Sequence, residues 1–479
     1  MAAVAGGNAA DGFSVAAALL MFLLAAWAVH PLLGLHLTVF ATLVADSVTL
    51  VWYPMIKNFS SRESILFVYD RLTFSPIDVT LGFAMACLLV RRIATGQPLV
   101  RGPLLRPLLT FTGFVLFGFV YGLARGGDSR VAVFEVRPLL YLPMVYLLAS
   151  NICRDARQFR QLWWTAIAAI FCQSLASLNY YTKLGDDTKA TMESLGEHGA
   201  AVGMSLLLVL LIAWSAFRGC SKRGRLALVV MTIPVGWVFF LSNRRAAVVG
   251  LLAGVIMLSV ILFWRQPKTF WKFAPVAALV LVVYTALFWN STSTGGFPAQ
   301  AIKSAVAPGS VSTRDQNSDI YRQLENKDLN FTIRQSKLLG TGFGKPFLQP
   351  FGLPDISSNF EFHNYIPHNS ILWIWLQTGF FGFVAMFYLF ARSLMIGAAK
   401  IRSLRDGPEV VVVGMAAIFI TMYAVFAYVD IAWDARNMVL LGMAFATIAH
   451  YPSHRGAGSG DAIREGGASE GMLTARAPM

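Results

Sequence analysis

The sequence has little charge and very little cysteine. Only 13% of its 479 residues are charged, whereas 56% are hydrophobic, and the mean hydropathy is +0.59. Soluble globular domains carry about 25% charged residues, so this composition excludes that class. The cysteines lie in apolar segments or short basic loops, without metal-ligand spacing: Cys87, Cys153, Cys172 and Cys220. A disulfide framework and a cysteine metal site are therefore excluded as well.

In place of charge, the chain has thirteen apolar segments, most of them about as long as a helix that crosses the hydrocarbon core. The first two, 13–29 and 32–51, flank His30-Pro31 and form either two spans or one broken, re-entrant element. They show no cleavage site, so we expect both to be retained. The others are 77–90, 107–124, 132–150, 161–178, 199–217, 226–241, 246–264, 273–290, 369–391, 409–429 and 436–450. We predict an all-α polytopic membrane protein with 12–13 transmembrane helices.

This pattern divides the chain into four parts. We expect an N-terminal transmembrane bundle at 1–290, a long polar loop containing a helix at 291–368, and C-terminal transmembrane helices at 369–452. The Gly-, Ser- and Ala-rich segment 453–479 has the composition of a disordered tail. Because most basic residues lie in short loops, the net charge of +14 does not indicate nucleic-acid binding. The lipid bilayer is the partner that this composition predicts.

Basic residues cluster in every second connection, which predicts the topology by the positive-inside rule. The basic connections are 91–106, 154–160, 218–225, 265–272 and 392–405, and we expect them to be cytoplasmic. The remaining connections are then external: 52–76, 125–131, 179–198, 242–245, 291–368 and 430–435. The tail is expected inside. No Lys or Arg precedes Lys57, so the N-terminus has no orientation signal.

Several charged residues fall on the predicted external side. Arg244 and Arg245 form a basic pair in a short external turn, where basic residues are disfavoured. Arg137 lies just inside the outer end of a span, where a charge is costly and marks a functional candidate. Glu135, two positions earlier, faces another side of the helix and is not expected to pair with it. Other external polar groups are Asp430, Asp434, Arg436, Glu193, Glu197 and His198.

Two histidines end the long polar loop, in the stretch Phe362-His363-Asn364-Tyr365-Ile366-Pro367-His368-Asn369-Ser370. Proline is tolerated just before a helix, and Asn369 or Ser370 is a good N-cap for the apolar run that follows. His368 would then lie at the membrane surface, beside a helix N-terminus that favours negative charge. The alternative is that both histidines are interfacial loop residues without chemistry.

The long loop contains one predicted helix. Asn317-Ser318 can cap a helix over about 319–337, which carries Arg322, Lys327, Arg334 and Lys337. For Arg322 alone, a solvated helix face is the simpler interpretation. The glycine run Gly340-Thr341-Gly342-Phe343-Gly344 follows this helix. It lacks a preceding strand and the Lys-Ser/Thr pair of a P-loop, so we reject a phosphate-binding role for it.

Taken in order, short motifs at about 240–385 resemble the O-antigen ligase and Wzy-type polysaccharide polymerase superfamily. Order and spacing both match, whereas each motif alone is weak. The chain departs from the pattern in having a second histidine, His363, and a doubled arginine, which leaves the assignment within each pair open. The motifs are Ser242-Asn243-Arg244-Arg245-Ala246, Ser318-Asp319-Ile320-Tyr321-Arg322, Leu339-Gly340-Thr341-Gly342-Phe343-Gly344, Pro367-His368-Asn369-Ser370-Ile371-Leu372 and Gln377-Thr378-Gly379.

The resemblance implies a GT-C-like glycosyltransferase in the bacterial inner membrane, with its active site facing the periplasm. Such enzymes move a glycan from undecaprenyl diphosphate to an acceptor hydroxyl, and a single displacement inverts the anomeric centre. The arginine fork suits a diphosphate, which assigns this role to Arg244 or Arg245 together with Arg322. No metal or other cofactor is then needed, and His368 would take the acceptor's proton. The secondary candidates are Arg137, His363, Asn369 and Asp434.

Two alternatives stay open at this level. A transporter or flippase of lipid-linked glycans is the other function class, but its usual signs are related halves with broken spans and midplane charges. The sequence shows no internal repeat, and most candidate charges lie at span ends, which favours the enzyme. Within the enzyme class, a ligase uses the lipid A core as acceptor and a polymerase uses a second lipid-linked glycan repeat. The sequence does not choose between them.

Overall fold

The computed structural model describes residues 9–44, 67–69, 72–192, 194–196, 198–291, 293–357 and 360–452. Within them, nine helices are long and apolar enough to cross a membrane. These are α5 (Leu105–Ala124), α6 (Ser129–Ile152), α7 (Ala156–Lys183), α9 (His198–Ala216), α10 (Lys222–Leu241), α11 (Arg245–Arg265), α12 (Pro267–Leu287), α15 (Ser370–Ser403) and α16 (Pro408–Val429). The prediction of an all-α polytopic membrane protein is confirmed. The predicted tail at 453–479 lies outside the described residues.

Four further helices coincide with the remaining predicted spans. They are α1 (Ala9–Val29), α2 (Pro31–Val44), α4 (Pro76–Thr95) and α17 (Ala435–His450). At 14 residues, α2 is only about 21 Å long, which is shorter than a hydrocarbon core of about 30 Å. It packs against α1, and His30 separates the two. A small antiparallel ribbon, β1 (Phe67–Tyr69) with β2 (Leu72–Thr73), precedes α4.

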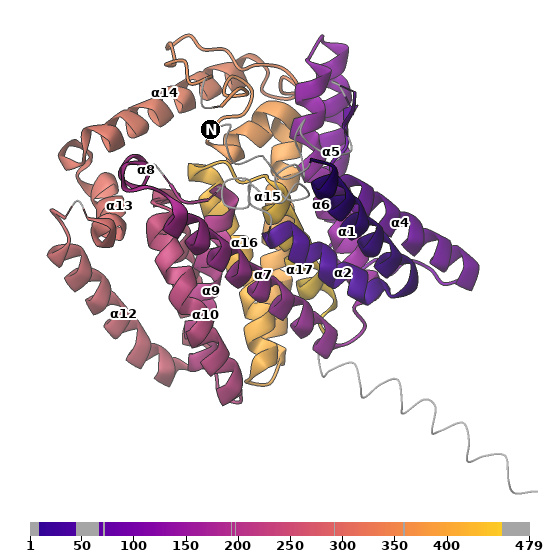
Figure 1. Ribbon diagram of the computed structural model, residues 1–479, viewed down its shortest axis with the longest axis horizontal. Helices are drawn as coiled ribbons and strands as arrows, with labels where there is room; N and C mark the ends of the chain where they lie inside the picture. Colours follow the sequence, from indigo (N-terminus) through magenta and orange to yellow (C-terminus); the bar gives the residue numbers. More distant parts are fainter. Residues whose placement is uncertain are drawn as a thin grey trace, which may run out of the picture.

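The core of the bundle is formed by helices from both ends of the chain. α17 packs on α6, α16 packs on α11, and α15 packs on both α5 and α16. In the most apolar stretch of α16, 83% of the residues are buried, whereas α12 has no buried residue at all. Figure 1 shows α12 at one edge of the molecule and α4 at the opposite edge, with α15, α16 and α17 between them. An apolar helix without buried residues is stable only where lipid covers it.

The connections predicted to share one side of the membrane do meet at one end of the bundle. Figure 1 shows α14 (Thr313–Gln335) lying across this end, which we call the α14 side. One hydrogen bond joins two of these connections, from Asp128 N to Gly344 O (2.8 Å). Two more join a connection to the end of a helix: Leu195 N to Leu241 O (3.3 Å) and Ser370 Oγ to Asp430 O (3.0 Å). Most of the connection 52–76 lies outside the described residues.

α14 begins at Thr313 and ends at Gln335, whereas the sequence predicted about 319–337. Its N-cap is Ser312, whose hydroxyl accepts a hydrogen bond from Asp315 N (3.2 Å) and donates one to the Asp315 carboxylate (2.9 Å). This cap lies upstream of the predicted Asn317-Ser318 cap, and residues 313–318 join the helix as a result. At the other end, the carbonyl of Lys337 accepts from Phe380 N (3.1 Å), which takes the chain out of the helix.

α15 is broken at Gly379, whose φ of 71° and ψ of −177° interrupt the helix. The segment after α14 satisfies the backbone groups that this break leaves without helical partners. Thr341 N donates to Leu376 O (2.7 Å), and Phe380 N donates to Lys337 O (3.1 Å). Non-helical backbone inside a membrane protein requires such internal partners. Two motifs about 35 residues apart, Leu339–Gly344 and Gln377-Thr378-Gly379, therefore form one packing unit.

The glycines of this unit are required by its geometry. Gly340, Gly342 and Gly344 all have positive φ, at 72°, 81° and 76°. A Cβ on Gly342 would lie 2.4 Å from the Cα of Gly122 in α5, so the two backbones touch directly. The N–H of Phe343 donates to a carbonyl of α5, and that of Gly344 donates to the carboxylate of Glu135 (2.6 Å). These donors are used by packing, which agrees with our rejection of a phosphate-binding role.

Glu135 links α6 to this unit. It is fully buried, and its carboxylate also accepts from Trp373 Nε1 (3.3 Å) and Gln377 Nε2 (3.1 Å). Three donors from two other segments satisfy the buried carboxyl, which holds α6, the glycine run and α15 together. Glu135 does not pair with Arg137, as the helix geometry predicted.

Candidate functional site

A polar cavity of about 620 Å³ lies on the α14 side of the bundle. Its walls come from the α10–α11 turn, from α14, from the end of α16 and from α13 (Phe297–Val306). Arg244, Arg245 and Arg322, the three arginines predicted to bind a diphosphate, all line it. Residues that are far apart in the sequence therefore meet in one space large enough for a diphosphate group.

The turn between α10 and α11 directs both arginines of the pair. Asn243 has φ of 49°, in the left-handed region that asparagine tolerates better than most residues. Arg244 follows in an extended conformation as the N-cap of α11, and Arg245 is the first helical residue. Because their backbone conformations differ, the two side chains leave the turn in different directions and reach different partners.

Arg245 joins α11 to α13 and α14. Its guanidinium binds both carboxylate oxygens of Asp319, at 2.9 and 3.0 Å, and donates to Ser304 Oγ at 2.8 Å. The carboxylate of Asp315 lies 3.8 Å away. A bidentate pair of this kind is strong and fixes orientation as well as distance. Arg245 is therefore held by α14 before any ligand binds.

Arg244 and Arg322 line the same cavity with different surroundings. Arg244 donates from Nη2 to Ser194 Oγ at 2.8 Å, in the connection between α8 (Asp186–Thr191) and α9. Arg322 lies one helical turn after Asp319 and is half-buried. Among the described residues, Arg322 makes no hydrogen bond or ion pair. Its fork is available to a ligand in the cavity.

His368 lies at the start of α15, against α14. Its Nδ1 is 3.2 Å from Oε1 of Glu325, and its backbone N–H donates to Oε2 of the same carboxylate at 2.9 Å. The Glu325 side chain is only 2% exposed, whereas that of His368 is 21% exposed. One buried carboxylate thus fixes both the backbone and the ring of His368. With the proton on Nδ1, Nε2 is left as a hydrogen-bond acceptor.

Asn369, one of the two N-cap residues that the sequence predicted, is the N-cap of α15, and Ser370 is the first helical residue. The side-chain oxygen of Asn369 accepts from Leu372 N (3.0 Å), and its Nδ2 donates to Asn326 Oδ1 (3.0 Å) on α14. The cap therefore fastens the start of α15 to the same helix that carries Glu325. By fixing the start of α15 on α14, Asn369 also helps to fix the position of the neighbouring residue His368.

Tyr321 lies beside the histidine. Its ring is edge-on to His368, with ring centroids 5.8 Å apart. Burial and the neighbouring Glu325 carboxylate raise the pKa of the Tyr321 phenol well above its usual value, so the hydroxyl stays protonated. That hydroxyl is buried and has no hydrogen-bond partner among the described residues.

His363 has a different environment from His368. It is buried, its Nδ1 lies 3.2 Å from Phe360 O, and its Nε2 lies 3.6 Å from the exposed Asp355. Neither His363 nor His368 is among the residues that line the cavity. Its contacts are those of a residue that holds the local fold of the loop.

Asp434 makes structural contacts at the start of α17. It is the N-cap of α17 and accepts from Asn437 N and Asn437 Nδ2, both at 2.9 Å. Its carboxylate lies directly against the backbone of Gly199 in α9. Asp434 therefore ties the start of α17 to α9.

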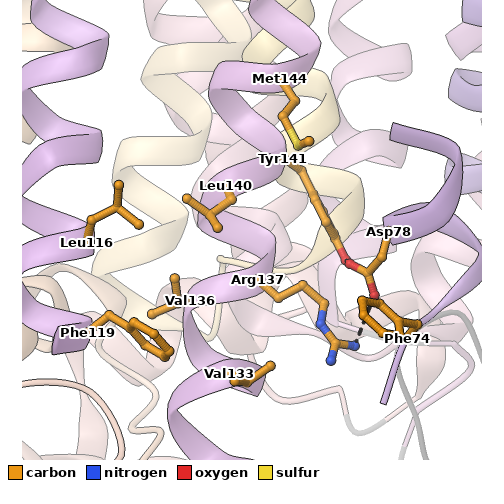
Figure 2. Close-up of a pocket in the computed structure, with 10 residues that line it drawn as sticks. All are labelled: Phe74, Asp78, Leu116, Phe119, Val133, Val136, Arg137, Leu140, Tyr141 and Met144. Carbon is orange, nitrogen blue, oxygen red and sulfur yellow. Dashed lines mark hydrogen bonds and ion pairs between the residues drawn. The ribbon is translucent and has the colours of Figure 1, made fainter. Parts of the chain in front are cut away.

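Arg137 lies away from the arginine cavity. It lines a separate, mainly apolar pocket of about 300 Å³ between α4, α5 and α6. Figure 2 shows its guanidinium directed toward Asp78, which lies 3.4 Å away, while the hydroxyl of Tyr141 meets the same carboxylate. Asp78 also belongs to the capping box that begins α4. Arg137 is thus part of a polar link between α4 and α6.

Sequence analysis missed Glu325, which has the most direct contact with His368. The signal was present, because Tyr321, Arg322 and Glu325 fall on one side of a helix at spacings of one turn. The helix was predicted, but its carboxylates were not matched to the histidine 43 residues later. Glu193 and Glu197, which the sequence placed on the external side, lie outside the described residues.

Comparison with protein families matches residues 226–387 to the family described as O-antigen ligase. The match extends from α10 into α15 and includes Arg244, Arg245, Arg322, Glu325 and His368. It confirms the resemblance to the O-antigen ligase and Wzy-type superfamily, and it supports glycan transfer of the ligase or polymerase type. No curated protein matches the chain.

Proposed function

We propose that this chain, which matches the O-antigen ligase family over 226–387, moves a saccharide from undecaprenyl diphosphate to an acceptor hydroxyl. The reaction takes place at the periplasmic face of the bacterial inner membrane, inverts the anomeric centre and uses no metal. One observation carries the proposal. One helix, α14, carries both Arg322 in the cavity and Glu325, the partner of His368, and this supports an anion site and a base in the same region of the protein.

The donor's leaving group is a lipid diphosphate. Arg322 offers these phosphate oxygens a guanidinium fork to which no described residue is bound, and Arg244 lines the same cavity. Arg245 already forms an ion pair with Asp319 on α14. We infer that this pair fixes α14 against α11 and thereby positions Arg322. Guanidinium groups bind phosphate oxygens bidentately and stay charged, so they stabilise the diphosphate as negative charge develops on it.

His368 acts as the general base. With Nδ1 directed at Glu325, its Nε2 accepts the proton of the acceptor hydroxyl. The acceptor oxygen forms a bond to the anomeric carbon while the bond from that carbon to the diphosphate oxygen breaks. The electron pair leaves with the diphosphate, next to the arginines. Glu325 stabilises the imidazolium that results, since the opposite charge lies 3.2 Å away.

A ligase and a polymerase differ in the acceptor that they use. Purified protein in lipid nanodiscs should be given an undecaprenyl-diphosphate-linked glycan and either lipid A core or a second lipid-linked repeat. We expect a product with one of these acceptors, an inverted anomeric linkage by NMR, and no loss of transfer in a chelator. No product with either acceptor would contradict the proposal, and retention at the anomeric carbon would contradict the single displacement.

Arg322→Lys tests the diphosphate site directly. It keeps the charge but loses the bidentate fork, so we expect most transfer to be lost while the protein still inserts and folds. The matched control is Arg334→Lys, an exposed arginine on the same helix, which should transfer normally. Normal transfer by Arg322→Lys would place the diphosphate elsewhere in the protein.

A further inference from the structure

Lys303 is a buried cation in the wall of the arginine cavity. It belongs to the last turn of α13 and is only 6% exposed. Lysine is almost never so deeply buried unless it is paired, because removing an ammonium group from water is costly. The groups around Lys303 therefore indicate whether its charge is compensated within the protein.

The partners of Lys303 are neutral. Its Nζ donates to Asn290 Oδ1 at 3.3 Å and lies 5.5 Å from the centre of the Trp289 ring. Within the part of the chain that the structure describes, no carboxylate pairs with it. An amide oxygen and an aromatic face solvate an ammonium group only in part, and they leave its charge without a counterion.

Two other cations of the cavity, Lys189 and Arg245, are paired with carboxylates. Lys189 pairs with Asp186 at 3.2 Å, and Arg245 pairs with Asp319 at 2.9 Å. Lys303 and Arg322 line the same space without a carboxylate partner among the described residues. Asp315, Asp430 and Arg244 also line the cavity, but Lys303 and Arg322 are two cations for which the described residues supply no carboxylate partner, and such cations favour an anionic ligand.

We propose that Lys303, together with Arg322, binds the diphosphate of the lipid-linked donor, with Lys303 as the second cation of that site. The inference rests on the proposed function, because it takes the donor to carry a diphosphate. A diphosphate diester has one negative charge on each phosphate, which matches the two cations. Lysine acts as a compact point charge on phosphate, whereas arginine adds bidentate geometry.

A purely structural lysine would behave differently. If Lys303 served only to cover Trp289 and the end of α13, replacing it would weaken the fold and leave ligand binding intact. If instead it is held for an anion, the empty protein keeps an uncompensated buried charge. Replacing it by an apolar side chain of similar length then costs the unliganded protein nothing or stabilises it.

The test is binding of undecaprenyl diphosphate without sugar, measured on purified protein in nanodiscs. For Lys303→Met we expect a Kd increased roughly ten- to a hundredfold, the range for a hydrogen bond to a charged group, with no fall in the melting temperature of the empty protein. Lys303→Arg should bind within about threefold of the native protein, because the charge is retained. Lys327→Met, at an exposed lysine of α14, is the matched control and should bind normally.

A probe without sugar also separates the two possible sources of negative charge. If Lys303 contacts an acidic sugar of the glycan instead, Lys303→Met binds undecaprenyl diphosphate as well as the native protein does, and the inference fails. A fall in melting temperature with unchanged binding overturns it too. Should Lys303→Met fail to fold, Lys303→Gln, which can keep the hydrogen bond to Asn290, takes its place in the same comparison.

Failure of the inference and failure of the proposed function give different results. If the native protein transfers glycan but Lys303→Met binds the diphosphate normally, only the role of Lys303 is wrong. If the native protein binds the diphosphate and Lys303→Met does not, but no acceptor yields product, the proposed reaction is wrong and the anion site stands.

Discussion

At the scale of single residues, the two histidines that end the long loop differ in the groups that they contact. His368 contacts one buried carboxylate through both its ring and its backbone, and this leaves Nε2 directed away from α14. His363 is buried against the carbonyl of Phe360 and an exposed aspartate. A base must be held within roughly 2.6–3.2 Å of the hydroxyl that it deprotonates. Only His368 combines a fixed position with an exposed ring edge.

This contrast predicts the ranking of the two alanine variants in a lipid-linked donor assay. His368→Ala should lose transfer by roughly a hundredfold to ten-thousandfold, the usual cost of removing a general base, and should melt nearly as the native protein does. His363→Ala should keep at least roughly a tenth of the activity and lose stability instead, because it leaves a gap in the loop. The reverse ranking, with both variants folded, would move the base to His363.

Glu325 is a positioning residue in this scheme, and Glu325→Gln isolates its charge. Glutamine keeps one acceptor for the backbone N–H of His368 but cannot stabilise an imidazolium ion. We expect kcat to fall by about ten- to a hundredfold while KM for the donor stays nearly constant. Asp328→Asn is the matched control, because Asp328 is a buried carboxylate one turn later that accepts from Phe351 N (3.0 Å). Equal losses of kcat in both variants would indicate a general effect on α14.

The doubled arginine gives a stability prediction. Arg245→Ala removes the partner of Asp319, whose side chain is 23% exposed, and should cost about 1–3 kcal/mol of unfolding free energy. Replacing Asp319 by Ala as well should recover part of this loss, because the carboxylate no longer lacks its partner. Arg244→Ala removes, among the contacts of this arginine, its hydrogen bond to the Ser194 hydroxyl (2.8 Å), and we expect it to lower the melting temperature as well. Thermal melting of the three variants checks these expectations.

At the scale of elements, the break in α15 and the glycine run after α14 depend on each other. Gly379 opens the helix, and the segment 337–341 supplies the partners for the exposed backbone. The same segment ends α14, so the helix with Arg322 and Glu325 is anchored to the helix that follows His368. The catalytic candidates are therefore placed by packing between backbones, which requires glycine at the points of contact.

Gly342→Ala should show this dependence. Its φ of 81° already disfavours a side chain, and the added Cβ would lie 2.4 Å from the backbone of Gly122. We expect a loss of several kcal/mol or failure to accumulate in the membrane. Gly126→Ala is the matched control: its φ is 77° and no atom lies within 4 Å of the added Cβ, so it should cost only about 1–2 kcal/mol. Similar melting of the two variants would mean that the close approach is unimportant.

The same elements show what the sequence could and could not predict. Long apolar runs give each span, because one helix must satisfy its own backbone in lipid. The start of α14 was misplaced because the sequence offers two serine caps, and the local pair of Ser312 with Asp315 was not recognised as the one that begins the helix. The contact between Glu325 and His368 joins two segments across a loop, and no local pattern encodes that distance. Arg244 and Arg245 were found because basic residues are rare in external turns, and Arg322 was found through the family resemblance. Lys303 carried neither signal within a loop rich in polar residues.

At the scale of the whole molecule, the two ends of the bundle differ in what they contain. The α14 side has the cavity, the histidine and the long loop. At the opposite end, Arg265 pairs with Asp406 at 2.7 Å and donates to backbone carbonyls of the α15–α16 connection. The short connections rich in basic residues were predicted to lie at this end, which the positive-inside rule would make the cytoplasmic side. The lipid-linked donor that we propose would reach the protein from one leaflet, so the orientation of the bundle decides whether the cavity can bind it.

Thiol labelling tests this orientation in a variant whose four native cysteines are replaced. Cysteines placed singly at Gly185 and Ser310 lie at exposed positions on the α14 side, and one at Lys222 lies at the exposed start of α10. α10 has 20 residues and is therefore about 30 Å long, so Lys222 and the arginine turn at its other end face opposite sides of a bilayer. We expect an impermeant maleimide to label positions 185 and 310 in intact cells, and position 222 only after permeabilisation. Labelling at 222 in intact cells would place the cavity on the cytoplasmic side, away from periplasmic acceptors, and the proposed reaction could not stand there.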